Sequence, residues 1–203
     1  MKKRKITICV SVLCTLCIVG GLAFFRLRNG VGIKPTGNFD LANPITSYRQ
    51  DDESWAADRL GDSAYTMKSS GCLVTCIASA VSADGETVTP GELNALFSEN
   101  AVYDSEGNLQ WYRLAELDGY HVNVYPNVST ADIQQCLAEG HYPIVRVRIH
   151  GIGNHHYVLI VGTENGEYMC MDPLRDELTK LSDYWGLVYA IRCVWKDGGT
   201  NGS

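Results

Sequence analysis

The hydrophobic pattern changes character about two thirds of the way along the chain, and this change constrains the fold more than any other feature. Before it, apolar residues recur at helical spacing, most clearly over Ser70 to Ala83, where Ser70 is the expected helix cap. After it, β-branched and aromatic runs predict four strands, over 144–149, 157–161, 168–171 and 187–195. Helices packed on a following antiparallel sheet predict an α+β domain.

Local signals place further elements around this division. Thr89, Pro90 and Glu92 form a capping box with proline at the first helical position, which predicts a second helix start. Asn165-Gly166 separates the second and third strands of the sheet and predicts a hairpin. The pattern also predicts two short helices, over Trp111–Leu117 and Ser129–Ala138, and one more strand, over His121–Tyr125.

The first residues predict a membrane anchor. Lys2 to Lys5 form a basic cluster, and an uncharged run of 20 residues follows from Ile6 to Phe25. A helix of that length spans the ~30 Å hydrocarbon core, and the basic cluster should stay in the cytoplasm. The domain would then be extracytoplasmic, on a single-pass cell-membrane protein. A cleaved signal peptide, which would release a secreted domain, stays open as an alternative.

Composition then divides the chain into four parts. We expect the basic stretch and transmembrane helix over 1–28, a linker or extended lead-in over 29–47, one domain over 48–196 and a disordered tail over 197–203. Residues 1–30 carry six basic side chains and no acidic one, which leaves eleven basic against 23 acidic side chains for the remainder. A domain this acidic is a poor partner for nucleic acid.

Five cysteines fall in the predicted domain, and the odd number leaves at least one thiol outside any intramolecular disulfide. Cys170 and Cys193 both lie on predicted strands, and we hypothesise that they pair. Cys72 and Cys76 lie on successive turns of one helix and are poorly placed for an unstrained bond. An unpaired cysteine in an exported domain calls for a chemical explanation.

Four features along the domain fit one reaction. Cys72, after Gly71 at the predicted helix start, would have its thiolate stabilised by the helix N-terminus. A histidine of the His155-His156 pair would take the thiol proton, and Asp172 on a neighbouring strand would orient that histidine. Because side chains alternate along a strand, at most one histidine of the pair does so. The amide of Gln50 and the backbone N–H of the nucleophile would stabilise an oxyanion.

These features together resemble a known family. Gln50 with Trp55, Ser70-Gly71-Cys72, the run from His156 to Gly162, and Met171-Asp172-Pro173 are similar to motifs of the C39-like peptidases, which are papain-like cysteine peptidases related to bacteriocin-processing enzymes. The resemblance covers about residues 45–195. It implies a papain-like fold and peptide-bond hydrolysis, with Cys72 as nucleophile, His156 as general base, Asp172 as orienting acid and Gln50 in the oxyanion hole.

The sequence also departs from the family. In the transporter-fused leader peptidases the glutamine lies a few residues before the cysteine, whereas Gln50 lies 22 residues before Cys72 and the domain is expected outside the cytoplasm. Cleavage of double-glycine leaders is therefore not implied. The expected partners are a peptide or protein substrate and the membrane.

Three alternatives stay open at this stage. A cell-wall amidase or endopeptidase would use the same chemistry, and a non-catalytic peptide-binding domain could share the fold. His150, His155, His156 and Cys170 could bind zinc, although none has the spacing of a common zinc motif. No cofactor is expected.

Overall fold

The computed structural model describes residues 15–22, 24–25, 27–41, 45–83 and 87–197. Residues 15–22 and 24–25 are helical, and the other half of the predicted membrane span lies outside the described residues. Within the described ranges, no helix has both the length and the apolar character needed to cross a membrane.

The elements follow the predicted order of helices first and strands second. The helices are α2 (Met67–Ser70), α3 (Cys72–Ser82), α4 (Pro90–Glu99), α5 (Trp111–Leu114) and α6 (Thr130–Ala138), with two 3₁₀ turns, η1 (Ile149–Gly151) and η2 (Leu181–Tyr184). The strands are β1 (Val31–Gly32), β2 (Tyr120–Val124), β3 (Pro143–Arg148), β4 (His155–Glu164), β5 (Glu167–Met171), β6 (Thr179–Lys180), β7 (Leu187–Val188) and β8 (Ala190–Lys196).

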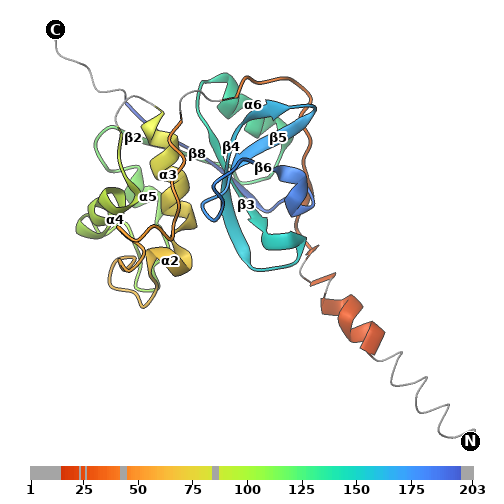
Figure 1. The fold of residues 1–203 in the computed structure, drawn as a ribbon, viewed down its shortest axis with the longest axis horizontal. Helices are drawn as coiled ribbons and strands as arrows, with labels where there is room; N and C mark the ends of the chain where they lie inside the picture. Colours follow the sequence, from red (N-terminus) through yellow and green to blue (C-terminus); the bar gives the residue numbers. More distant parts are fainter. Residues whose placement is uncertain (1–14, 23, 26, 42–44, 84–86, 198–203) are drawn as a thin grey trace, which may run out of the picture.

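A six-stranded antiparallel sheet divides the domain into two cores. Its strand order is β2-β8-β3-β4-β5-β6, and Figure 1 shows α2 to α5 grouped on one side of it and α6 on the other. Side chains alternate along β4, so Leu159 and Val161 pack with α3, while Val158 and Ile160 pack with α6 and η2. Burial on both faces is why this strand is almost continuously apolar.

The capping box at Thr89 and the hairpin signal at Asn165-Gly166 are confirmed. Thr89 caps α4, and its hydroxyl accepts from the backbone N–H of Glu92 while the Glu92 carboxylate accepts from the Thr89 backbone N–H. β4 and β5 form a hairpin through Asn165 and Gly166, whose φ angles are 52° and 77°. Both angles lie in the left-handed region that this tight turn requires.

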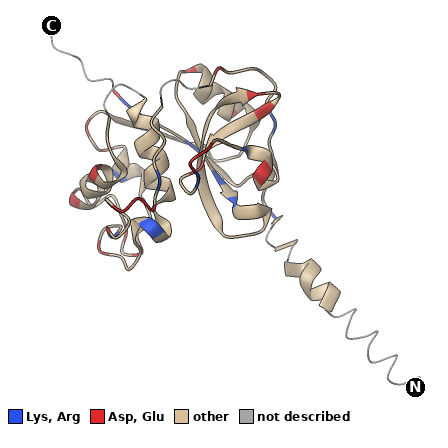
Figure 2. Cartoon of the chain, in the orientation of Figure 1, with Lys and Arg blue, Asp and Glu red and all other residues tan. Residues whose placement is uncertain are grey.

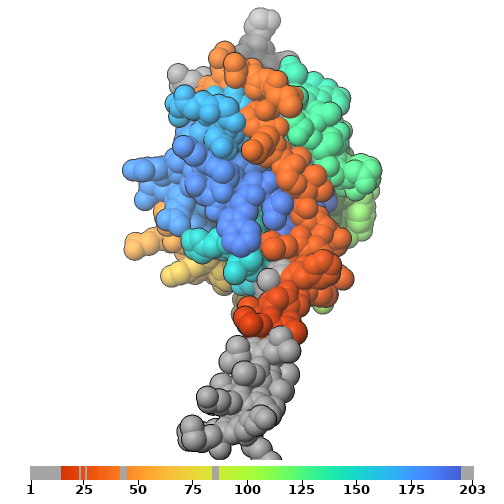
Figure 3. All heavy atoms as spheres, turned by 90° about the vertical axis from the view of Figure 1, so that its right-hand side faces the viewer, coloured from red at the N-terminus to blue at the C-terminus, as the bar shows by residue number. Residues whose placement is uncertain are grey.

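The segment before the domain lies against the sheet as an extended chain. β1 pairs with β7, and Ile33 is buried in the core on the α6 side. Further along, the backbone N–H of Phe39 donates to Thr163 Oγ1. Figure 3 shows this strap, drawn in orange, running along the face of the domain from the N-terminal helix. Residues 31–41 therefore have fixed contacts with the domain.

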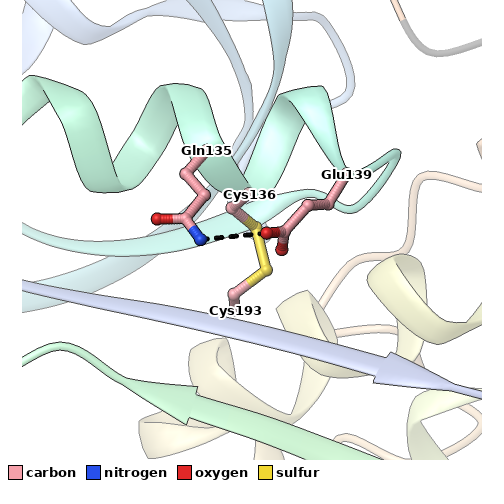
Figure 4. The surroundings of a disulfide bond; sticks show 4 residues. All are labelled: Gln135, Cys136, Glu139 and Cys193. Atoms are coloured by element: carbon pink, nitrogen blue, oxygen red, sulfur yellow. Dashed lines mark hydrogen bonds between the residues drawn. A yellow bond between two sulfur atoms is a disulfide. The ribbon is translucent and has the colours of Figure 1, made fainter.

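The hypothesised disulfide between Cys170 and Cys193 is wrong. Cys193 on β8 instead bonds to Cys136 on α6, as Figure 4 shows, and the sequence separation of the two cysteines is 57. β3 and β4 lie between β8 and β5, so three strand spacings of ~4.8 Å separate Cys193 from Cys170. That distance exceeds the reach of a disulfide, for which Cα atoms lie ~7 Å apart at most. Cys72, Cys76 and Cys170 are free thiols.

Candidate active site

Cys72 is the first residue of α3, but its helix does not begin as expected. Ser70 is not the cap, because a short helix, α2, runs directly into α3 and ends at Ser70. Thr66 caps α2, and Gly71 forms the junction. A Cβ on Gly71 would lie 2.5 Å from the carbonyl oxygen of Met67, so only glycine fits this junction. The tight junction holds the Cys72 side chain partly exposed at the start of α3.

His156 and Asp172 form a buried pair at the neighbouring ends of β4 and β5. His156 Nε2 lies 2.6 Å from Asp172 Oδ1, and the two side chains are 4% and 5% exposed. Asp172 Oδ1 also accepts from the backbone N–H of Leu174 at 2.8 Å, which forms the turn that Pro173 begins. Asp172 therefore shapes the turn and holds the histidine.

The ring of His156 also contacts the Cys72 side chain. Burial by itself would lower the pKa of His156, but hydrogen bonds to Asp172 and Cys72, with the charges of both groups, outweigh burial and raise this pKa to about 9. Burial by itself would raise the pKa of Asp172, but its hydrogen bond to His156 and the charge of that ring outweigh burial and lower it. A protonated imidazole beside an ionised Asp172 carboxylate is the electrostatic state that these shifts favour.

This geometry assigns the two nitrogens of the His156 ring. Nε2 bonds to Asp172, which leaves Nδ1 for the Cys72 sulfur. α3 packs on the opposite face of the sheet from Val158 and Ile160, the residues that share a face with His156. The ring of His156 nevertheless contacts Cys72, because both residues lie where their elements begin, Cys72 at the first residue of α3 and His156 at the second of β4.

Gln50 lies between the two halves of the site. Its backbone N–H donates to the carbonyl oxygen of Pro173 at 3.0 Å, and its side-chain Nε2 donates to the carbonyl oxygen of Lys68 at 2.8 Å. These bonds tie it to the turn after Asp172 and to the helix just before Cys72. Since the Lys68 carbonyl can only accept, the amide orientation is fixed, and the second N–H of Nε2 stays available. Gln50 is only 4% exposed.

The remaining candidates lie outside this cluster. His155 is exposed, and its ring lies edge-on to Tyr189 with centroids 5.2 Å apart. Cys76, one turn after Cys72, is buried and donates its thiol to the carbonyl oxygen of Tyr157. Burial raises the pKa of Cys76 and of Cys170, which keeps both thiols protonated.

Tyr184 belongs to the site, although no sequence pattern pointed to it. Its hydroxyl, at the end of η2, donates to Asp172 Oδ2. No motif surrounds it, and it follows Asp172 by 12 residues. Only the fold of β6 and η2 places the two side chains together.

A hollow of about 320 Å³ opens onto Cys72. Most of its lining is apolar or aromatic, with the side chains of Tyr65, Leu73, Leu109, Trp111 and Tyr157. A second hollow, of about 750 Å³, lies on the far side of the pair and is lined by Asp172, Tyr184, Arg49 and Arg175. Of these two hollows, the smaller is the one that Cys72 lines, so a molecule that reacts with this thiol would lie there.

The zinc alternative lacks the ligand geometry it needs. Among the residues that the structure describes, no three His, Cys, Asp or Glu side chains gather as a metal site requires. Cys170 is buried on β5 and His156 is bonded to Asp172.

Comparisons with known proteins give evidence on the fold of this chain. No protein-family model matches the sequence, and neither does any curated protein. A search of solved structures matches the crystal structure of a "putative C39-like peptidase" from Bacillus anthracis, with a TM-score of 0.52 and 13% sequence identity. The match covers 78% of this chain and 97% of that one. This chain resembles a C39-like peptidase in its fold. At so low an identity, the likeness extends to the fold alone.

The raised pKa of His156 predicts the alkaline limit of any activity that depends on its proton. Activity should be retained while the ring is protonated and should fall as pH rises through about 9. In Asp172→Asn the carboxylate that raises this pKa is lost, so the alkaline limb should move to lower pH. Hydrolysis rates measured across the pH range on both proteins test this. An alkaline limb at the same pH in both would show that the limb does not report the proton on His156.

Proposed function

We propose that this protein is a cysteine peptidase that hydrolyses peptide bonds with Cys72 as nucleophile, His156 as acid and base, and Asp172 as the orienting carboxylate. One observation carries the proposal. A partly exposed thiol at a helix start contacts a buried histidine that is hydrogen-bonded to a buried carboxylate, at the wall of an apolar hollow. This is the arrangement that activates a cysteine for nucleophilic attack. The likeness in fold to a C39-like peptidase supports it.

The first half of the reaction forms an acyl-enzyme. The Cys72 thiolate attacks the substrate carbonyl carbon, a C–S bond forms, and the carbonyl electron pair moves to the oxygen. The free N–H of Gln50 and the backbone N–H of Cys72 stabilise that oxyanion. The C–N bond then breaks, and protonated His156 gives its proton to the departing amine.

The second half releases the enzyme. Neutral His156 takes a proton from water, whose oxygen attacks the thioester carbon. The C–S bond breaks, the product carboxylate leaves, and the thiolate returns beside protonated His156. Asp172 holds the ring in the same orientation through both halves, because its contacts with His156 and Leu174 need not change.

The substrate is best sought with two classes of compound in parallel. Purified chain should cleave members of a peptide library, with a preference for an apolar side chain near the scissile bond because the hollow at Cys72 is apolar. Purified peptidoglycan is the second substrate, and cleavage of its peptides with no cleavage of the library would identify a cell-wall enzyme. If neither is cleaved, but a library peptide binds and protects Cys72 from alkylation, the domain is a peptide-binding module.

We further propose that the domain is extracytoplasmic and tethered to the cell membrane by residues 6–25. The basic cluster before this run supports that orientation. The disulfide between Cys136 and Cys193 supports it independently, because disulfides persist in oxidising compartments outside the cytoplasm.

Protease shaving tests this topology. Protease added to intact cells should remove the domain and leave a cytoplasmic control protein intact. A protected domain would contradict the proposed topology. Release of the domain into the medium without protease would indicate a cleaved signal peptide instead.

A further inference from the structure

We propose that Tyr184 is a positioning residue that fixes the Asp172 carboxylate and, through it, the His156 ring. This inference rests on the proposed function for its effect on rate, but its contacts belong to the fold. The Tyr184 hydroxyl donates to Asp172 Oδ2, while Oδ1 holds His156 and the Leu174 backbone. Each carboxylate oxygen thus has a donor, and the carboxylate can rotate only by breaking one of them.

Because the contact is buried, the hydrogen bond from Tyr184 should stabilise the charged form of Asp172. Asp172 is 4% exposed and Tyr184 is 6% exposed, so water cannot readily replace the hydroxyl. A buried carboxylate that loses a hydrogen-bond donor is destabilised in its charged form. In agreement, burial raises the pKa of Asp172, while the contacts with His156 and then the hydrogen bond from Tyr184 lower it.

The direction of the bond follows from the groups around it. An ionised Asp172 can only accept, so the single hydroxyl proton of Tyr184 points to the carboxylate. The Tyr184 oxygen also lies 3.2 Å from Thr179 Oγ1 on β6, and the single hydroxyl proton of Thr179 can go either to Tyr184 or to the carbonyl oxygen of Cys170. Burial and the carboxylate raise the pKa of Tyr184, which keeps its hydroxyl protonated and able to donate to Asp172.

The turn that carries Tyr184 is itself locked. Asp183 accepts from the Lys180 backbone N–H at the start of η2, and Trp185 ends the turn with a φ of 62°. The Trp185 ring covers Gly151 so closely that a Cβ there would lie 2.1 Å from a ring carbon. Gly151 belongs to η1, which leads into β4 and His156. Tyr184 at the end of η2 thus contacts Asp172, and the adjoining Trp185 contacts η1, the turn before His156.

Tyr184→Phe tests the proposal by removing only the hydroxyl. We expect kcat to fall roughly tenfold with little change in KM, as for a lost hydrogen bond to a buried charge. In an Asp172→Asn background the same change should have less than about a twofold effect, because the group through which Tyr184 acts is already gone. Tyr168→Phe removes a hydroxyl from a fully buried tyrosine on β5 in the same core and serves as the matched control.

A readout independent of catalysis accompanies the kinetics. The Asp172 carboxyl, followed by NMR in the full chain, should titrate at higher pH in Tyr184→Phe than in wild type and Tyr168→Phe. An unchanged Asp172 pKa, or equal losses of rate in both backgrounds, would overturn the proposal. A wild-type chain with no hydrolytic activity, combined with the raised Asp172 pKa in the variant, would contradict the proposed function and leave the positioning contact standing.

Discussion

Cys72→Ser should abolish hydrolysis, the largest effect that we expect from any single substitution. One atom changes at the start of α3, where the side chain is partly exposed and is not among the buried residues of the helix, so the fold should be retained. A hydroxyl is a far weaker nucleophile here, because its pKa lies well beyond the range in which the helix start and His156 can ionise it. Hydrolysis rate and thermal unfolding, measured on the same preparation, separate loss of chemistry from loss of fold.

Cys76→Ser is the matched control for this substitution. It lies one turn further along the same helix, and its thiol donates to the Tyr157 carbonyl, a bond that a serine hydroxyl can also make. Most activity should therefore remain. An inactive Cys76 variant beside an active Cys72 variant would show that the nucleophile is misassigned.

His156→Ala should lower kcat by at least ~10²-fold, the usual contribution of a positioned general acid and base. The buried ring is the sole link between the Cys72 thiol and the Asp172 carboxylate that the described contacts provide. Its removal also leaves a buried carboxylate without its charged partner, so some loss of stability should accompany the loss of rate. Rates per folded molecule, normalised by circular dichroism, give the chemical effect.

Substitutions at two neighbouring residues serve as comparisons for His156→Ala. His155→Ala should stay within a few-fold of wild type, because this exposed ring lies against Tyr189 on the other side of the strand. Asp172→Asn should be intermediate, since it misorients the base without removing it. An inactive His155 variant beside an active His156 variant would reverse the assignment of the two histidines.

The parts of the fold that could be predicted depend on short-range signals. The Thr89–Glu92 capping box and the Asn165-Gly166 turn each act within four residues, so the sequence contains all that determines them. The start of the Cys72 helix depends on a wider context. Ser70 has the right chemistry for a cap, but α2 occupies the preceding turn, and the close approach of Gly71 to Met67 decides the junction instead.

The parts that could not be predicted depend on strand order and long-range contacts. β8 inserts between β2 and β3, which brings Cys193 to Cys136 and separates it from Cys170. No local pattern encodes that insertion. The same limit applies to Tyr184, whose contact with Asp172 exists only because η2 folds back under β5. Gln50, His156 and Asp172 could be singled out because their residue types carry chemistry, whereas a tyrosine after a turn has no such signal.

The most direct test of the central claim is to trap the nucleophile. Purified chain is incubated with a peptide carrying a thiol-directed electrophile in place of its scissile bond, and the adduct is located by mass spectrometry of proteolytic fragments. Within the domain, one equivalent of adduct should form on Cys72, with Cys76 and Cys170 unmodified because both are buried and protonated. Labelling should be lost in His156→Ala. An unmodified Cys72 in a folded chain, or equal labelling with and without His156, would contradict the account.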